Sequence, residues 1–392
     1  MTDRKKTLRV GIVGYSFMGA AHSQAWRTAG RFFDLPLRPE MVVLCGRDAT
    51  AAEAAAERMG WQEVTTDWRS LVERDDIDVI DICTPGDSHA EIALAALAAG
   101  KHVFCEKPLA NSVSDAEAMS RAAREAAERG VRSMVGFNYR RVPAAAFARR
   151  LVAEGRLGRI HHVRAVYLQD WIVDPEFPLV WRLQREHAGS GALGDLASHI
   201  VDLAEYITGD RIAGVSGITE TFVKERPIAS ASSGLAATGG ESRGPVTVDD
   251  AALFLARTHG GAVGTFEATR FASGRKNAAR IEVNGSAGSV SFDVESLNEL
   301  WFHDHTEDAR TGGFRRILVT EPEHPYAGAW WPAGHGLGYE HTFTHEVVDF
   351  VRDIADGRDP SPSFADGLRV QRVLDAVERS AADQARWQEI PA

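Results

Sequence analysis

The sequence predicts an α/β protein of two domains, in which a doubly wound parallel sheet is followed by an α/β domain with a large, mostly antiparallel, open-faced sheet. Three observations favour this fold class. The chain has 392 residues, more than the roughly 250–300 at which a single hydrophobic core stops growing. Its first third alternates short apolar runs with alanine-rich helical segments, as βαβ units do. Its later segments alternate apolar and polar residues, as half-buried antiparallel strands do.

The first domain is predicted to contain several short strands and the helices that connect them. Strands are expected at residues 8–13, 41–45, 79–83, 102–105 and 131–137. Two connecting segments, 49–59 and 89–99, have helix-forming composition and are followed by Gly60 and Gly100, the residue type that most often ends a helix. Because this pattern closes near Asn138, we expect one domain over 1–138 and a second over 139–392.

The second domain is predicted to be built around the antiparallel sheet. Its strands are expected at 160–169, 212–223, 248–257, 262–270, 280–283 and 290–294. A helix at 195–207 interrupts them. The segment 230–245 is rich in Gly, Ser and Ala, which favours a flexible loop at the edge of the sheet. The aromatic, glycine-rich segment 324–338 is typical of a folded lid. Helices at 342–355 and 364–387 close the chain and can pack back on the first domain.

Composition and charge exclude several classes of protein. Apolar residues make up 44% and charged residues 25% of the chain, as in ordinary globular enzymes. The net charge of -11 argues against binding to nucleic acid or to an anionic membrane surface. No segment approaches the ~20 apolar residues that span a bilayer. The basic start of the chain is followed by a short strand and not by the long apolar stretch of a signal peptide. The three cysteines lie in apolar runs, as buried free thiols do in a reducing compartment. We therefore expect a cytoplasmic protein.

A glycine-rich loop follows the first predicted strand and opens a helix. Residues 14–19 read Gly-Tyr-Ser-Phe-Met-Gly, which matches the dinucleotide-binding pattern G-x-G-x-x-G with serine at its middle position. The free amides and the positive dipole end of the following helix would hold a pyrophosphate. The expected cofactor contacts of this loop are Gly14, Ser16, Phe17, Met18 and Gly19.

The end of the second predicted strand bears on the choice of cofactor. An acidic residue there would favour the ribose of NAD, whereas Arg47 can accept a 2′-phosphate or stack on adenine. Asp48 follows directly. We therefore expect NAD, with NADP as an open alternative, and count Arg47 among the cofactor contacts.

Further motifs resemble those of one enzyme family, the Gfo/Idh/MocA oxidoreductases. They are Cys-Thr-Pro at 83–85 followed by His89, Ala-Gly-Lys-His-Val-Phe-Cys-Glu-Lys-Pro-Leu at 99–109, and Gly-Asp-Leu-Ala-Ser-His at 194–199. Within that family, the segments 167–171, 181–182, 188–195 and 361–367 resemble the levoglucosan dehydrogenase subfamily. The resemblance covers nearly the whole chain.

The resemblance implies a Rossmann domain for dinucleotide binding, then an α/β domain that binds substrate on one face of its sheet and commonly forms oligomers through the other. It adds as cofactor contacts Thr84, Pro85, His89, Glu106 and Lys107. It also implies a catalytic group of Lys107, Asp195 and His199.

These residue types suit the oxidation of a secondary alcohol. The reaction removes a hydroxyl proton while a hydride leaves the same carbon, so a base that works near neutral pH is required. His199 titrates in that range, and Asp195, four residues earlier on the expected helix, would share its face and orient it. Lys107 follows a strand at the carboxyl end of the sheet, where ligands bind in this architecture, and its ammonium would stabilise a developing alkoxide. The sequence leaves open whether Lys107 or His199 takes the proton.

The substrate is expected to be a sugar, an anhydrosugar such as levoglucosan, or a cyclitol, oxidised at a ring hydroxyl and by resemblance at C3. Hydrogen bonds and an aromatic platform hold such polyols. The expected substrate contacts are Tyr139, Asp170, Trp171 and Arg182, together with Lys107, Asp195 and His199. Two alternatives stay open: a scyllo- or myo-inositol dehydrogenase, and an NAD-dependent glycosidase of the same fold.

No metal site is expected. His341 and His345 are four residues apart on a predicted helix, but the sequence offers no third ligand and the pattern lacks the glutamate spacing of a zinc protease. The open sheet of the resembling family also leads us to expect a homo-oligomer, a dimer or a tetramer.

Overall fold

The computed structural model describes residues 6–233 and 236–391. Contacts between Cα atoms divide the chain into two compact units. Of the described residues, the first takes in 6–138, 339–371 and residues 233 and 236, and the second takes in 139–232, 237–338 and 372–391.

The first unit contains a parallel sheet, as the sequence predicts. Within residues 6–138 it has six strands in the order β3-β2-β1-β4-β5-β6. They are β1 (Thr7–Val13), β2 (Arg38–Cys45), β3 (Glu63–Thr65), β4 (Val79–Ile82), β5 (His102–Glu106) and β6 (Ser133–Gly136). The chain runs outward from β1 in both directions, so the strand order reverses between β1 and β4. Ligands of doubly wound sheets bind outside the carboxyl ends of the strands at such a point.

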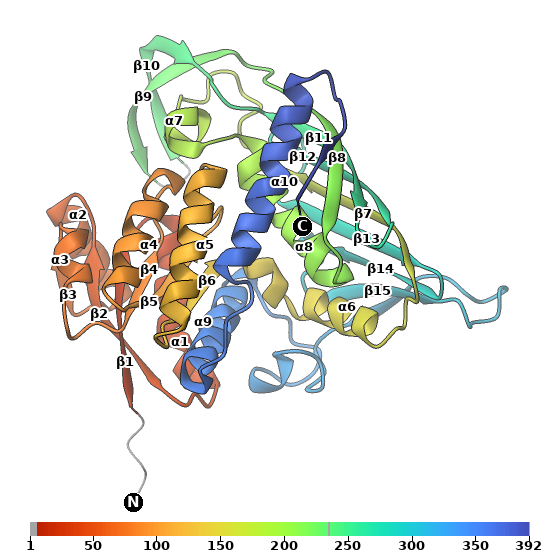
Figure 1. Cartoon of the computed structure of the whole chain (residues 1–392), viewed down its shortest axis with the longest axis horizontal. Coiled ribbons are helices and arrows are strands. Elements are labelled where there is room, and N and C mark those ends of the chain that lie inside the picture. Colours follow the sequence, from red (N-terminus) through yellow and green to blue (C-terminus); the bar gives the residue numbers. More distant parts are fainter. Residues whose placement is uncertain (1–5, 234–235, 392) are drawn as a thin grey trace, which may run out of the picture. The chain divides into compact units, whose positions relative to one another are not determined.

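Helices connect the strands of this unit (Figure 1). They are α1 (Phe17–Phe32), α2 (Ala49–Met59), α3 (Trp68–Val72), α4 (His89–Ala98) and α5 (Val113–Ala127). Helix α9 (Tyr339–Asp356) packs against α1, and α10 (Phe364–Ala382) begins in the first unit and ends in the second. Helix α2 has the predicted bounds, because the Asp48 side chain caps its start and Gly60, at φ +84°, ends it.

The second unit contains the predicted large sheet. In its described part, nine strands have the order β16-β15-β14-β13-β7-β12-β11-β8-β17. They are β7 (Ile160–Leu168), β8 (Ile212–Glu220), β11 (Ala251–Thr258), β12 (Val263–Thr269), β13 (Ala278–Gly285), β14 (Gly288–Asp293), β15 (Glu299–Asp304), β16 (Arg315–Leu318) and β17 (Gln388–Glu389). The β7–β12 pair is parallel and the other pairs are antiparallel. The fold class predicted from the sequence is confirmed.

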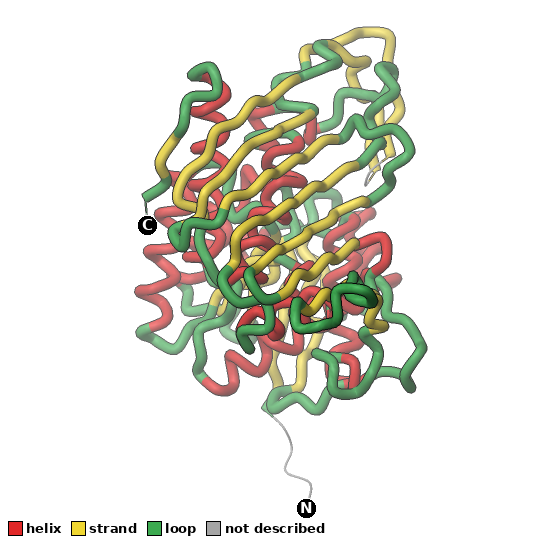
Figure 2. The backbone as a smooth tube through the Cα atoms, turned by 90° about the vertical axis from the view of Figure 1, so that its right-hand side faces the viewer, coloured by secondary structure: helices red, strands yellow, loops and turns green. Residues whose placement is uncertain are grey.

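Two helices of the second unit, α6 (Pro143–Ala153) and α8 (Ser198–Thr208), pack against each other and against strands of this sheet. The strands lie side by side across the front of the view in Figure 2. Alternate side chains of the sheet, such as Phe254 on β11 and Phe266 on β12, are buried, whereas Leu253 and Leu255 on β11 point the other way and are exposed.

The prediction of a flexible loop at 230–245 is wrong. The chain forms β9 (Glu225–Ser233) and β10 (Ala236–Pro245), which pair in a separate two-stranded sheet; residues 234 and 235 lie outside the described residues. The small residues that suggested a linker instead allow close packing, since a Cβ on Gly244 would lie 2.9 Å from the Leu179 side chain. Leu179 also joins β9 directly, because its N–H donates to the Pro227 carbonyl at 2.6 Å.

The predicted helix at 195–207 also differs in detail. A π-helical turn, η4 (Leu193–Ala197), precedes α8. The start of η4 is held by Asp249, whose carboxylate accepts hydrogen bonds from the N–H groups of Gly191 at 2.7 Å and Leu193 at 2.8 Å. Asp195 therefore lies in a widened turn, and His199 lies in the first turn of the regular helix. Such π turns occur often at functional sites.

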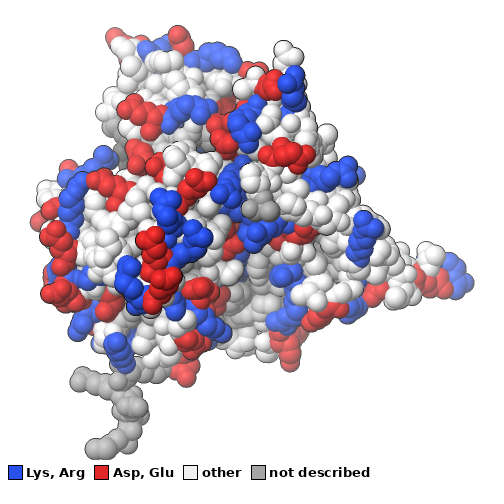
Figure 3. Space-filling model, in the orientation of Figure 1, with Lys and Arg blue, Asp and Glu red and all other residues white. Residues whose placement is uncertain are grey.

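The surface carries both signs of charge. On the face drawn in Figure 3, acidic and basic side chains are interspersed. None of the helices in the described ranges has the length and apolar character needed to cross a membrane.

Candidate active site

The glycine loop of the first unit has the backbone that a dinucleotide site needs. Gly14 has a φ of +104°, and a Cβ there would lie 2.8 Å from the Cys83 carbonyl oxygen. A Cβ on Gly19 would lie 2.1 Å from the Gly14 carbonyl oxygen. Both positions therefore require glycine, because any side chain would push α1 away from the loop.

The start of α1 can receive a phosphate. Ser16 is the N-cap residue, but its side chain makes no capping hydrogen bond, and the first turn contains no acidic residue. The amides of the first turn are therefore not capped by Ser16, and the helix dipole favours an anion there. Ser16, Phe17 and Met18 lie where the sequence places them, and the loop fits the pyrophosphate of NAD.

The end of β2 contains both residues that bear on cofactor choice. Asp48 uses a carboxylate oxygen to accept the Ala51 N–H at 2.8 Å, so it caps α2. Arg47 is exposed. Because Asp48 caps α2, its presence at this position does not require a contact with ribose. Arg47 is the side chain at this strand end that is available to adenine or ribose.

The motifs after β4 and β5 are joined by His89. One ring nitrogen of His89 lies 2.9 Å from the Thr84 carbonyl oxygen, and the other lies 3.0 Å from the Pro108 carbonyl oxygen. His89 is 1% exposed. It therefore holds the Thr84–Pro85 turn to the turn after Lys107, and backbone carbonyl oxygens contact both of its ring nitrogens.

Lys107 directly follows β5 and is half-buried. Its backbone N–H donates to Glu106 Oε2 at 3.1 Å. The Glu106 carboxylate turns into the protein, where its Oε1 lies 2.9 Å from His22 Nε2. Glu106 was predicted as a cofactor contact, and the structure also makes it the connection between Lys107 and the interior of the sheet.

A buried polar cluster beneath this site was not predicted. His22 from α1 contacts both Asp81 from β4 and Glu106, and Trp26 Nε1 donates to Asp81 Oδ2 at 2.6 Å. By type and spacing His22, Asp81 and Cys83 could hold a metal ion. Both Asp81 oxygens already accept hydrogen bonds, so we interpret the group as a hydrogen-bonded cluster. The signal that could have revealed it is the aspartate within the apolar run 79–82.

In the second unit, a buried arginine holds Asp195. Arg270 is 1% exposed, and its Nη2 donates to Asp195 Oδ2 at 2.9 Å and to the Gly191 carbonyl at 3.2 Å. Its guanidinium also lies 5.3 Å from the centre of the Trp171 ring. An adjacent guanidinium favours the ionised form of a carboxylate. In the sequence, Arg270 is marked only as the last residue of a predicted strand.

His199 lies against two tyrosines. It is 8% exposed, and its ring centre lies 4.8 Å from that of Tyr139 and 5.8 Å from that of Tyr167. Tyr139 was predicted as a substrate contact, and the structure brings it beside the candidate base. Tyr167 was not chosen, although it begins one of the segments that resemble the family.

The two tyrosines belong to a hydrogen-bonded group of neutral side chains, which we call the polar belt: Tyr139, Tyr167, Gln169 and Asn277. The tyrosine hydroxyls are 2.8 Å apart, and Tyr167 donates to Asn277 Oδ1 at 2.6 Å. Gln169 Nε2 donates to the same oxygen at 3.0 Å. Burial raises the pKa of Tyr139, so its phenol stays neutral. The belt therefore offers neutral donors and acceptors beside His199.

The remaining predicted substrate residues are spread over the neighbouring loops. Asp170 Oδ2 binds Lys276 Nζ at 2.8 Å and the Gly274 N–H at 3.0 Å, which fastens the loop after β12. Trp171 lies beside Arg270, as described above. The Arg182 guanidinium lies 4.4 Å over the ring of Trp181. Trp171 thus lies near the Asp195 cluster, whereas the polar atoms of Asp170 are engaged in loop contacts.

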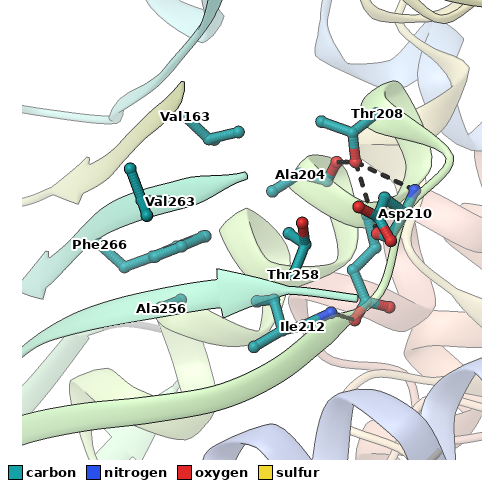
Figure 4. Close-up of a pocket in the computed structure, with 11 residues that line it drawn as sticks. Val163, Ala204, Thr208, Asp210, Ile212, Ala256, Thr258, Val263 and Phe266 are labelled. Atoms are coloured by element: carbon teal, nitrogen blue, oxygen red, sulfur yellow. Dashed lines mark hydrogen bonds between the residues drawn. The ribbon is translucent and has the colours of Figure 1, made fainter. Parts of the chain in front are cut away.

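A small cavity in the second unit is not part of this site. It lies between the end of α8 and the sheet, with Thr208, Asp210, Phe266 and Val263 among its lining residues (Figure 4). Its volume of about 10 Å³ is the size of one water molecule. It is at the opposite end of α8 from His199 and is too small for a sugar.

Comparison with known proteins agrees with this geometry. Residues 8–137 match the model of an oxidoreductase family with an NAD-binding Rossmann fold, and residues 146–291 match the GFO/IDH/MocA C-terminal domain. The chain is 43% identical to levoglucosan dehydrogenase of Pseudarthrobacter phenanthrenivorans, over 98% of this chain and 99% of that protein.

Two solved structures are similar over almost the whole chain. An oxidoreductase domain protein from Kribbella flavida has 66% identity and a TM-score of 0.94, covering 99% of this chain and 100% of the other. A levoglucosan dehydrogenase in complex with NADH and levoglucosan has 42% identity and a TM-score of 0.92, again covering 99% and 100%.

Proposed function

The chain belongs to the Gfo/Idh/MocA family of NAD-binding oxidoreductases, and from this premise we propose that it oxidises one ring hydroxyl of a sugar, an anhydrosugar or a cyclitol to a ketone. In this proposal residues 1–138 form the dinucleotide-binding domain, and residues 139–392 bind the substrate and form the oligomer. NAD, when bound, supplies the hydride acceptor at nicotinamide C4.

We assign the chemistry of the hydroxyl to Lys107, Asp195 and His199. Lys107 donates a hydrogen bond to the reacting oxygen and stabilises the developing alkoxide. His199 receives or passes on the hydroxyl proton, since imidazole is the side chain best suited to exchange a proton in the physiological pH range. Asp195 stays ionised and stabilises the charge that develops on the imidazole. The proposal that these three side chains act on the same hydroxyl rests on the family resemblance.

The observation that carries the proposal is the buried Arg270–Asp195 pair beside the polar belt. A carboxylate that already pairs with a buried guanidinium suits a permanent negative charge better than a base that must be protonated in each turnover. Hydroxyls and amides of the belt can both donate to and accept from a polyol. A neutral belt next to a fixed charge therefore favours an uncharged, hydroxyl-rich substrate over a carboxylic acid or a phosphate ester.

Levoglucosan is the specific substrate that we propose, with oxidation at C3 to a keto-sugar and formation of NADH. The support is the 43% identity to a levoglucosan dehydrogenase over nearly the full chain, together with a similar structure that was solved with NADH and levoglucosan. Inositol oxidation is the second candidate, since cyclitols offer the same ring hydroxyls.

A panel of polyols tests the proposal. Levoglucosan, glucose, myo-inositol, scyllo-inositol and a nitrophenyl glycoside are each incubated with NAD and, separately, with NADP. We expect NADH absorbance at 340 nm with levoglucosan and a preference for NAD. NADH formation with inositols alone would move the assignment to inositol dehydrogenase. Release of nitrophenol without net NADH would indicate a glycosidase, and silence across the panel would contradict the dehydrogenase.

We also propose that the protein is a cytoplasmic dimer or tetramer that associates through the open face of the large sheet. Ile218 and Leu253 are directly opposite each other on β8 and β11, and with Leu255 they form an apolar patch of side chains that are 40–57% exposed. The cysteines, all in the described ranges, are free buried thiols, which suits a reducing compartment. Light scattering should give a mass of two or four chains, and Leu255→Asp should reduce it; a monomeric parent protein would contradict this proposal.

A further inference from the structure

His22 lies fully buried between two carboxylates. Its Nδ1 is 2.9 Å from Asp81 Oδ1, and its Nε2 is 2.9 Å from Glu106 Oε1. His22 comes from the second turn of α1, Asp81 from β4, and Glu106 is the last residue of β5. The cluster therefore ties the helix of the glycine loop to two neighbouring strands of the parallel sheet.

The contacts of the His22 ring bear on its protonation state. A neutral imidazole has one N–H group, so it can donate to only one acceptor. Here each nitrogen faces a carboxylate oxygen, and each contact is short enough for a hydrogen bond. If both carboxylates are ionised, both contacts can be hydrogen bonds only when the ring carries two protons.

The surroundings of the ring agree with a charged imidazole. Burial alone would lower the pKa of His22, but the Asp81 carboxylate, with a smaller contribution from Cys83, raises it well above the ordinary value. The faces of the ring lie near Phe104 and Phe343, at 4.7 and 5.5 Å between ring centres. The titratable groups that face His22 are Asp81 on β4, Cys83 directly after β4, and Glu106 on β5.

The cluster continues to the candidate catalytic lysine. The Glu106 oxygen that does not contact His22 accepts the backbone N–H of Lys107 at 3.1 Å. Gly136 lets Glu106 occupy this place, because a Cβ there would lie 2.9 Å from Glu106 Oε1. A shift of the Glu106 carboxylate would therefore move the backbone that carries the Lys107 side chain.

We propose that His22 is a positioning residue, a buried imidazolium that fixes the Glu106 carboxylate and through it the backbone of Lys107 relative to the glycine loop. The positioning of Lys107 follows from contacts within the first unit, and its consequence for turnover rests on the proposed function. The role goes beyond that function, since it assigns a specific ionisation state to a buried residue and makes the position of the Lys107 backbone depend on it.

The protonation state can be measured without substrate or cofactor. In protein labelled with ¹⁵N-histidine, the His22 signals are assigned as those that disappear in His22→Gln. We expect both ring nitrogens of His22 to carry a proton from pH 6 to pH 8. A nitrogen with the chemical shift of an unprotonated imidazole at pH 7 would overturn the proposal.

The positioning role is tested with His22→Gln and a matched control, Trp26→Phe. Trp26 donates to Asp81 in the same cluster but has no hydrogen bond to Glu106 among its described contacts. In ¹⁵N-lysine-labelled protein, the backbone amide signal of Lys107 should shift in His22→Gln and stay close to its parent position in Trp26→Phe. Equal shifts in the two variants would reduce His22 to a core residue and contradict the proposal.

Kinetics give a second readout with the substrate found in the polyol panel. We expect kcat to fall about tenfold or more in His22→Gln with KM within about threefold, and both to stay near the parent values in Trp26→Phe, although both variants lower the melting temperature. An unchanged kcat in a folded His22→Gln protein would overturn the role in turnover. If the parent protein oxidises no polyol, the proposed function fails, whereas the two NMR measurements still decide the proposal on His22.

Discussion

Arg270 Nη2 lies 2.9 Å from Asp195 Oδ2, in a contact where the arginine is almost fully buried and the aspartate is about one-third exposed. The guanidinium also donates to the Gly191 carbonyl and lies near the Trp171 ring. The Arg270 side chain thus pairs with the Asp195 carboxylate, holds the turn before it, and lies beside Trp171, a candidate aromatic contact of the sugar. Loss of Asp195 would leave the Arg270 charge buried and uncompensated, and loss of Arg270 would leave Asp195 without its charged partner.

We predict that Arg270→Met, which keeps most of the volume, destabilises the fold by about 3 kcal/mol. It should also lower kcat/KM with the preferred polyol at least tenfold, because Asp195 loses its charged partner and the turn at Gly191 loosens. Urea unfolding and steady-state kinetics measure the two effects. The control is Arg280→Met, which removes partly exposed pairs with Asp293 and Glu295 and should change stability by less than about 1 kcal/mol. Similar behaviour of the two variants would contradict the importance of the buried pair.

Lys107→Ala should affect the chemical step more than cofactor binding. Removal of one donor to a developing alkoxide costs roughly 2–4 kcal/mol in that step, or about 30-fold to 1000-fold in rate. The glycine loop is untouched, so the Kd for NADH, measured by fluorescence, should change less than about threefold. Lys224→Ala, which removes an exposed pair with Glu220, serves as control. Parent-like rates in Lys107→Ala would refute the assigned role.

Gly19→Ala should damage the cofactor loop. A Cβ at this position would lie 2.1 Å from the Gly14 carbonyl oxygen, so α1 or the loop must shift and the amides of the first turn move from the pyrophosphate. We expect NADH affinity to fall at least tenfold. Gly30→Ala, on the same helix, is the matched control, because its Cβ would meet no atom closer than 3.9 Å. The control should gain up to about 1 kcal/mol from helix propensity, and a loss of affinity in Gly30→Ala alone would contradict the steric explanation.

Local patterns carried most of the fold prediction. The predicted strands of the parallel sheet correspond to β1, β2, β4, β5 and β6, because buried parallel strands are nearly continuous apolar runs. The error at β9 and β10 had a physical cause. Gly, Ser and Ala are typical of linkers when they stand alone, but here they allow close packing on the Leu179 segment, and that contact is not visible in the local sequence.

The site shows the same division between local and distant information. Gly14, Gly19 and Lys107 are marked by motifs of a few residues. Arg270 and Asp195 are 75 residues apart in the chain, and no periodicity connects them. His22 and Glu106 are 84 residues apart. Partners of buried charges at such separations become visible only when the strands that carry them are placed side by side.

The acid limb of the stability profile should depend on His102. Burial, together with Arg132, lowers the pKa of His102 to about 4, and its Nδ1 accepts the Arg132 N–H at 2.9 Å. Because this value lies below the ordinary pKa of about 6.5, protonation opposes folding. The contribution of His102 is therefore complete above about pH 6.5 and is lost as the pH falls through 4.

His102→Asn tests this, because its amide oxygen can still accept the Arg132 N–H but does not titrate. We expect the difference in unfolding free energy between the parent protein and the variant to decrease by about 3 kcal/mol from pH 7 to pH 4. Urea unfolding at half-unit pH steps measures it. His303→Asn, the same substitution at a half-buried position of β15, is the matched control. A constant difference for His102→Asn over this range would mean that the imidazole titrates normally in the folded protein.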